Sequence, residues 1–198
     1  MFKKNLKEVI FSLALGVLLG IISKYLDTIA VDGSWWSISL SYFGDLFTRL
    51  GIWILIATFI AAYSKTSINA AINTFLFFIG MLISYYVYSA YLFGFFPTSY
   101  FLWWGTLAIV SPFLAILVYK GKQKEKFAYI LPALPLGLML SLSLAIGPFY
   151  IDISYIEELI MYVVLCVIFY KQPKQLAVVI LLSFIVALII KQISPYHF

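Results

Sequence analysis

The fold is decided by the stretch Gly44-Asp45-Leu46-Phe47-Thr48-Arg49-Leu50-Gly51, which the apolar run 52–63 follows directly. Asp45 and Arg49 stand four residues apart at the mouth of an expected membrane helix over about 45–63. Positions i and i+4 share one side of a helix, and an acid that precedes a base is the better-oriented pair. We therefore expect the two side chains to pair where the apolar interior begins.

The composition is that of an integral membrane protein. Hydrophobic residues make up 64% of the chain, charged residues 11%, and the mean hydropathy is +1.05. A water-soluble domain with this composition would expose large apolar patches. Because a membrane helix uses about 20 residues, the sequence predicts a polytopic all-α bundle of about seven transmembrane helices, which forms a single domain over 1–198.

The apolar runs predict where these helices lie. The expected spans are approximately 9–26, 45–63, 69–96, 100–119, 127–146, 157–170 and 175–190. The connection 25–42 is too polar to span, and its paired tryptophans Trp35 and Trp36 indicate a segment at the headgroup level. Pro132 and Pro135 weaken the first half of the fifth helix. A re-entrant pair in place of the last two helices would give six spans.

Lysines in short loops predict the orientation. With the N-terminus in the cytoplasm, ten of the thirteen basic residues fall on the inner side: Lys3, Lys4, Lys7, Lys65, Lys120, Lys122, Lys124, Lys126, Lys171 and Lys174. An odd number of spans then places the C-terminus outside. We interpret the net charge of +5 as a topology signal in a multi-pass protein of the cell membrane, and we expect no nucleic-acid partner.

Small residues recur along one face of the first helix. Ser12, Gly16 and Gly20 are spaced by four, and Lys24 continues the same row. Gly-x-x-x-Gly is a pattern that lets two membrane helices approach closely. We expect packing against another helix of the same chain, with homodimerisation as the alternative.

Residues that carry metal, redox or nucleophilic chemistry are scarce. Cys166 is the only cysteine and His197 the only histidine, which leaves no disulfide and no His or Cys cluster for a metal. Glu157 and Glu158 are adjacent, so on a helix they point in directions about 100° apart and cannot share one site. The sequence therefore predicts no cofactor and argues against an enzyme without deciding the matter.

Five residues form the candidate ligand site. Lys24, Asp45 and Arg49 lie near the expected outer ends of the first two helices, and Tyr88 and Tyr91 lie in the outer half of the third. Ionisable residues inside a membrane bundle are usually functional. This favours a carrier or substrate-binding subunit with an outward-facing polar pocket, although the charges could instead clamp helices together.

The sequence is compatible with several functions. The alternative to a carrier is a non-transporting accessory or immunity-type membrane protein. A membrane-embedded enzyme and a purely structural role are less favoured. The expected partners are the lipid bilayer and either a small polar ligand or another membrane protein.

Overall fold

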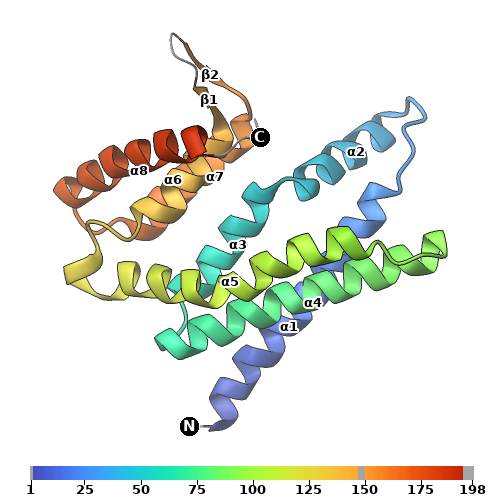
Figure 1. Ribbon diagram of the computed structural model, residues 1–198, viewed down its shortest axis with the longest axis horizontal. Coiled ribbons are helices and arrows are strands. Elements are labelled where there is room, and N and C mark those ends of the chain that lie inside the picture. The colour runs from blue at the N-terminus through green and yellow to red at the C-terminus, as the bar shows by residue number, and fades with distance from the viewer. Residues whose placement is uncertain (1, 147–149, 194–198) are drawn as a thin grey trace. The chain divides into compact units, whose positions relative to one another are not determined.

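A computed structural model describes residues 2–146 and 150–193 (Figure 1). The C-terminus, whose side of the membrane the sequence predicts, and His197 are not among the described residues. In the described ranges the chain forms eight α-helices, one 3-10 turn and a small hairpin. In order these are α1 (Phe2–Asp27), α2 (Trp35–Thr48), α3 (Leu50–Ala62), α4 (Ser67–Phe93), α5 (Thr98–Gln123), η1 (Glu125–Phe127), α6 (Ala133–Ser143), β1 (Leu144–Ile146), β2 (Ile151–Ile153), α7 (Ile156–Phe169) and α8 (Pro173–Ile193).

Long apolar helices dominate, as the composition predicts. Among the described residues four helices are long and apolar enough to cross a membrane: Leu6–Asp27, Ser67–Phe93, Thr98–Gln123 and Pro173–Ile193. The pair α2 and α3 makes a fifth if it is counted as one broken span. The all-α fold class is confirmed, and so is the capacity for several membrane crossings.

The number of seven spans stays a prediction. Helix α6 has 11 residues and α7 has 14. At about 1.5 Å per residue, neither alone reaches the roughly 30 Å of a hydrocarbon core. The orientation of the termini also stays a prediction.

The second expected helix is interrupted. Helix α2 ends at Thr48, and Arg49 takes an extended conformation with φ −80° and ψ 149° before α3 begins. The preceding segment, expected to lie at the headgroup level, contains most of α2. Ser34 starts this helix by accepting a hydrogen bond from the backbone N–H of Ser37, which is the usual reason that a helix begins at a serine.

The chain divides into two compact units. One comprises Met1–Leu50 with Tyr63–Ile116, and the other comprises Gly51–Ala62 with Leu117–Phe198. We refer to them as the first and the second unit and describe each by itself.

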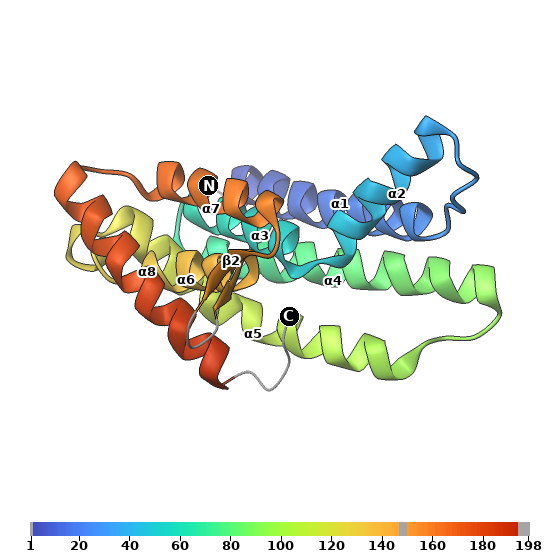
Figure 2. The same cartoon turned by 90° about the horizontal axis from the view of Figure 1, so that it is seen from above.

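In the first unit α1 and α4 lie side by side along their length (Figures 1 and 2). They run parallel, because Glu8 pairs with Lys65 just before α4 begins, and Asp27 contacts Tyr85 in its later half. Polar contacts therefore join α1 to the α4 segment at both ends of the helix pair.

Glycines allow the close approach of α1 and α4. A Cβ on Gly16 would overlap the carbonyl oxygen of Phe77, and one on Gly80 would lie 2.7 Å from the carbonyl oxygen of Leu13. The small face of the first helix therefore packs against α4 within the same unit, as small-residue faces of membrane helices do.

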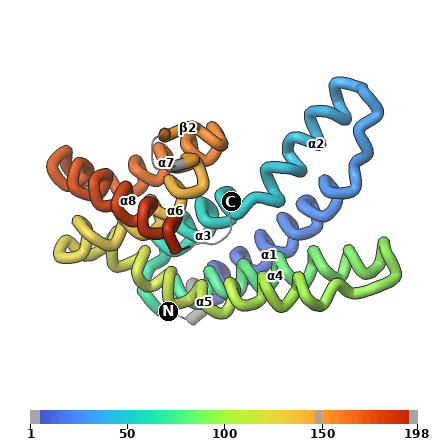
Figure 3. Tube along the Cα trace, turned by 45° about the horizontal axis from the view of Figure 1, so that its top comes forward, coloured from blue at the N-terminus to red at the C-terminus, as the bar shows by residue number. Residues whose placement is uncertain are grey.

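In the second unit α6 is the central helix and packs on α7 and α8 (Figures 1 and 3). Gly137 lets α6 approach α8, since a Cβ there would lie 2.5 Å from the Cβ of Val186. Tyr162 on α7 and Ser183 on α8 share a buried hydrogen bond of 2.9 Å. The strands β1 and β2 then pair antiparallel, with Leu144 opposite Ile153.

Candidate functional site

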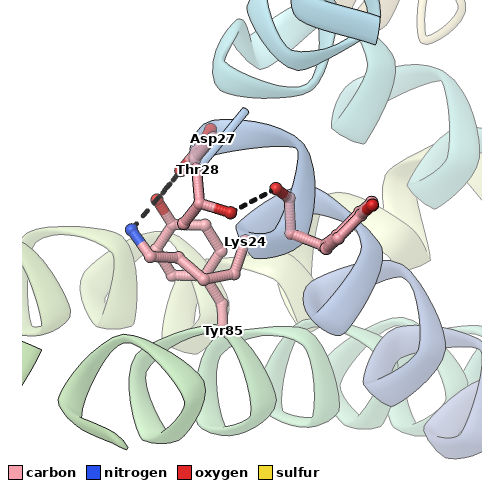
Figure 4. A network of polar contacts seen from close by, with 5 residues as sticks. Lys24, Asp27, Thr28 and Tyr85 are labelled. Atoms are coloured by element: carbon pink, nitrogen blue, oxygen red, sulfur yellow. Dashed lines mark hydrogen bonds and ion pairs between the residues drawn. The ribbon is translucent and has the colours of Figure 1, made fainter. Parts of the chain in front are cut away.

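A buried lysine stands in the last turn of α1. Lys24 is only 8% exposed, and its Nζ lies 3.7 Å from a carboxylate oxygen of Asp27, one turn further along the same helix (Figure 4). Both side chains are largely shielded, with side-chain exposures of 10% and 14%. An ammonium group removed from water to this extent requires an anionic or aromatic partner.

Aromatic rings complete the surroundings of this lysine. The hydroxyl of Tyr85 on α4 donates a hydrogen bond to Asp27 (Figure 4). Lys24 Nζ also lies 5.0 Å from the ring centroids of both Tyr85 and Phe93, which is within cation–π range. We call Lys24, Asp27, Tyr85 and Phe93 the Lys24 cluster.

The position of the cluster follows from the packing of α1 on α4. Gly20 lies against Met81 and Ser84, so the next residue of the same row, Lys24, reaches Tyr85 one turn further along α4. Lys24 therefore lies on the face of α1 that packs against α4, in the last turn of the helix. Asp27 supplies the opposite charge at the same end.

The predicted tyrosines differ in their positions on α4. Tyr91 is 83% exposed and points away from the protein interior. Tyr88 is half-buried and comes one turn after Ser84, which contacts α1. By helical spacing Tyr88 is therefore the nearer of the two to the Lys24 cluster.

The predicted pair of Asp45 and Arg49 lies at the end of α2. Asp45 is exposed, and Arg49 is half-buried at the point where the helix stops. Helix α2 meets α1 where Gly44 approaches the backbone of Leu26, since a Cβ on Gly44 would lie 3.2 Å from the carbonyl oxygen of Leu26. The partners of Lys24 described above come from α1 and α4. A shared cavity for Lys24 and Arg49 remains a hypothesis.

A second polar group precedes α2. Asp32 accepts hydrogen bonds from the hydroxyls of Ser34 and Ser37, each at 2.6 Å, and from the backbone N–H of Ser34. These bonds favour the carboxylate and lower the pKa of Asp32 to about 2. The arrangement fixes the start of α2 and explains its geometry without a ligand.

In the second unit the adjacent acids diverge, as expected from helical geometry. Glu158 is 1% exposed, whereas Glu157 is only half-buried. Glu158 lies against Gly51 of α3, where a Cβ would come within 2.8 Å of its Cγ. Among the described residues no group of three His, Cys, Asp or Glu side chains could hold a metal ion.

Sequence reasoning selected Lys24 but missed Asp27, Tyr85 and Phe93. Asp27 could have been found from its i, i+3 spacing to Lys24 on the same helix. The choice of Tyr85 over its neighbours required the register between α1 and α4, which no local pattern supplies.

No family model, no curated protein and no solved structure matches the chain. The chain is a candidate multi-pass membrane protein on the grounds of its apolar helices.

Proposed function

We propose that this protein is a carrier or substrate-binding subunit for a small polar solute, and that the Lys24 cluster is part of its binding site. One observation carries the proposal: a buried lysine, paired with a carboxylate and surrounded by aromatic rings, lies at one end of two apolar helices. Charged side chains are costly inside a bilayer, and those retained there usually belong to a transport or binding path.

The cluster offers both signs of charge to a solute. The distance of 3.7 Å between Lys24 and Asp27 exceeds the 2.7–2.9 Å typical of a direct charge-assisted hydrogen bond. A ligand carboxylate can therefore accept a hydrogen bond from Lys24. A ligand ammonium group can take the position between Asp27 and the aromatic rings. We expect Tyr88, one turn beyond Tyr85 on the same helix, to contact a solute that enters from this end.

The experiment is mass spectrometry of small molecules that co-purify with the detergent-extracted protein. One polar species should recur near one per protein in the wild type and be lost in Lys24→Met and in Asp27→Asn. Tyr91→Phe is the matched control, because that side chain is exposed and outside the cluster. If the same species stays bound to folded Lys24→Met protein, the Lys24 cluster is not the site.

The charge balance of the cluster favours a second candidate, a non-transporting accessory membrane protein. Lys24 already has an anion and two rings as partners, and these join α1 to α4. In this case the cluster is a clamp. The double variant Lys24→Met/Asp27→Asn distinguishes the two functions. If the cluster is a clamp, the variant protein is less stable but co-purifies with the same small molecules as the wild type. If the cluster is a binding site, the variant protein loses the bound solute.

A further inference from the structure

We propose that the second unit carries a binding surface for the phosphate headgroups of anionic phospholipids. The surface consists of the lysines at the end of α5, in the connection to α6 and in the connection between α7 and α8. We call it the lysine surface, and its members are Lys120, Lys122, Lys124, Lys126, Lys171 and Lys174. This proposal does not depend on the function of the Lys24 cluster.

The lysine surface holds the whole net charge of the chain. Its two segments, 120–126 and 171–174, contain six lysines and one acid, Glu125, which gives +5. The chain as a whole is also +5, with 13 basic and 8 acidic residues. The remaining seven basic and seven acidic residues therefore cancel. This concentration of positive charge complements the negative charge of an anionic headgroup.

The two segments are joined to each other although they lie about 45 residues apart in the sequence. The side chain of Gln175, which is 1% exposed, donates a hydrogen bond of 2.8 Å to the carbonyl oxygen of Ala128. Gln172 donates to the hydroxyl of Tyr129. These bonds hold the two lysine-bearing segments next to each other.

The end of α5 is fixed to α7 in the same region. Lys122 donates a hydrogen bond to the carbonyl oxygen of Ile168 in the last turn of α7, where the helix dipole favours a cation. Lys171 follows the end of α7 directly, three residues after Ile168, so the charges of Lys122 and Lys171 lie in the same region. Like charges held together in this way are stabilised by an anion that binds between them.

The surroundings of the lysines favour a lipid over a soluble anion. Lys120, Lys124, Lys126, Lys171 and Lys174 are exposed at the polar ends of apolar helices, which is where headgroups lie in a bilayer. Exposed apolar and aromatic side chains accompany them, among them Tyr129, Ile130 and Tyr170. Such side chains fit the glycerol and upper acyl region beneath a phosphate.

The test is native mass spectrometry of the full chain in detergent, titrated with phosphatidylglycerol or with phosphatidylcholine. Phosphatidylglycerol should bind more tightly than phosphatidylcholine. The variant Lys124→Gln/Lys126→Gln/Lys174→Gln should lose about tenfold or more in phosphatidylglycerol affinity, since a basic residue near an anionic membrane surface contributes on the order of 1 kcal/mol. The two hydrogen bonds that join the segments are made by Gln172 and Gln175, so this variant leaves them in place.

The matched control removes the same charge elsewhere. Lys3→Gln/Lys4→Gln/Lys7→Gln alters a second basic segment and should leave phosphatidylglycerol affinity within about threefold of the wild type, because the lysine surface stays intact. Equal losses in both triple variants would mean that only overall charge matters and would overturn the proposal. Binding of inorganic phosphate as tight as that of phosphatidylglycerol would also overturn the proposal, because the site would then be one for free anions.

Discussion

The hydroxyl of Tyr85 on α4 donates a hydrogen bond to the carboxylate of Asp27 at the end of α1. This bond links two helices that are parallel neighbours but lie far apart in the sequence. It also orients the carboxylate next to Lys24. The end of the helix pair is thus held by one phenol, one carboxylate and one ammonium group.

Removal of the Tyr85 hydroxyl should destabilise the protein. Tyr85→Phe keeps the ring next to Lys24 but leaves Asp27 without this donor, and a hydrogen bond to a charged group contributes about 1.5–3 kcal/mol. We expect a lower thermal unfolding temperature in detergent. Tyr91→Phe is the control, because the Tyr91 side chain is 83% exposed. Equal unfolding temperatures for both variants would contradict the role of the bond.

The α1–α4 contact should not tolerate a larger side chain at Gly16. Gly16→Leu places side-chain atoms where the backbone of Phe77 lies, and overpacking of this kind costs about 1–3 kcal/mol. Gly105 on α5 has no atom within 4 Å of an added Cβ. Gly105→Ala should therefore be neutral or stabilising by up to about 1 kcal/mol. Thermal unfolding of both variants in the same detergent is the measurement.

The start of α2 should respond to acid. Hydrogen bonds from Ser34 and Ser37 lower the pKa of Asp32 from 3.8 to about 2. The carboxylate therefore stabilises the folded state above its ordinary pKa, and this contribution is lost as the pH falls from about 3.8 toward about 2. Trp35 and Trp36 fluorescence should change over this range. Asp32→Asn should remove that transition, and an unchanged profile in the variant would assign it to another group.

Gln175 should be necessary for the stability of the second unit. Gln175→Leu leaves the buried carbonyl oxygen of Ala128 without its donor, and an unsatisfied buried group costs about 1–3 kcal/mol. Gln172→Leu is the matched control, because Gln172 is exposed and its bond to Tyr129 can be replaced by water. We expect the first variant to unfold at a clearly lower temperature and the second to unfold near the wild type.

The orientation can be measured with single reporter fusions. Fusions after Lys65, Lys124 and Lys174 should report the cytoplasm. Those after Ser34, Thr98, Ile153 and Phe198 should report the outside. The reason is that lysine-rich short loops stay on the cytoplasmic side. A cytoplasmic signal after Phe198 would exclude seven spans and favour six.

The sequence by itself determined the fold class and most of the helix positions. Continuous apolar runs of about 20 residues favour helices in a bilayer, because a helix bonds every backbone polar group within its own segment. The polar connections and the turn at Gly94, where φ is +72°, separate these runs locally. The row of Ser12, Gly16 and Gly20 likewise predicted a close helix contact, and Gly16 and Gly20 lie against α4.

Only the tertiary structure decided which side chains meet. The helix break at Arg49 was not predicted, because Leu50 and Gly51 continue an apolar pattern that is compatible with one helix. The partners of Lys24 depend on the register of α1 against α4, and Gln175 reaches Ala128 across 47 residues of sequence. Such contacts arise from packing between distant segments, and hydrophobic periodicity carries no information about which segments become neighbours.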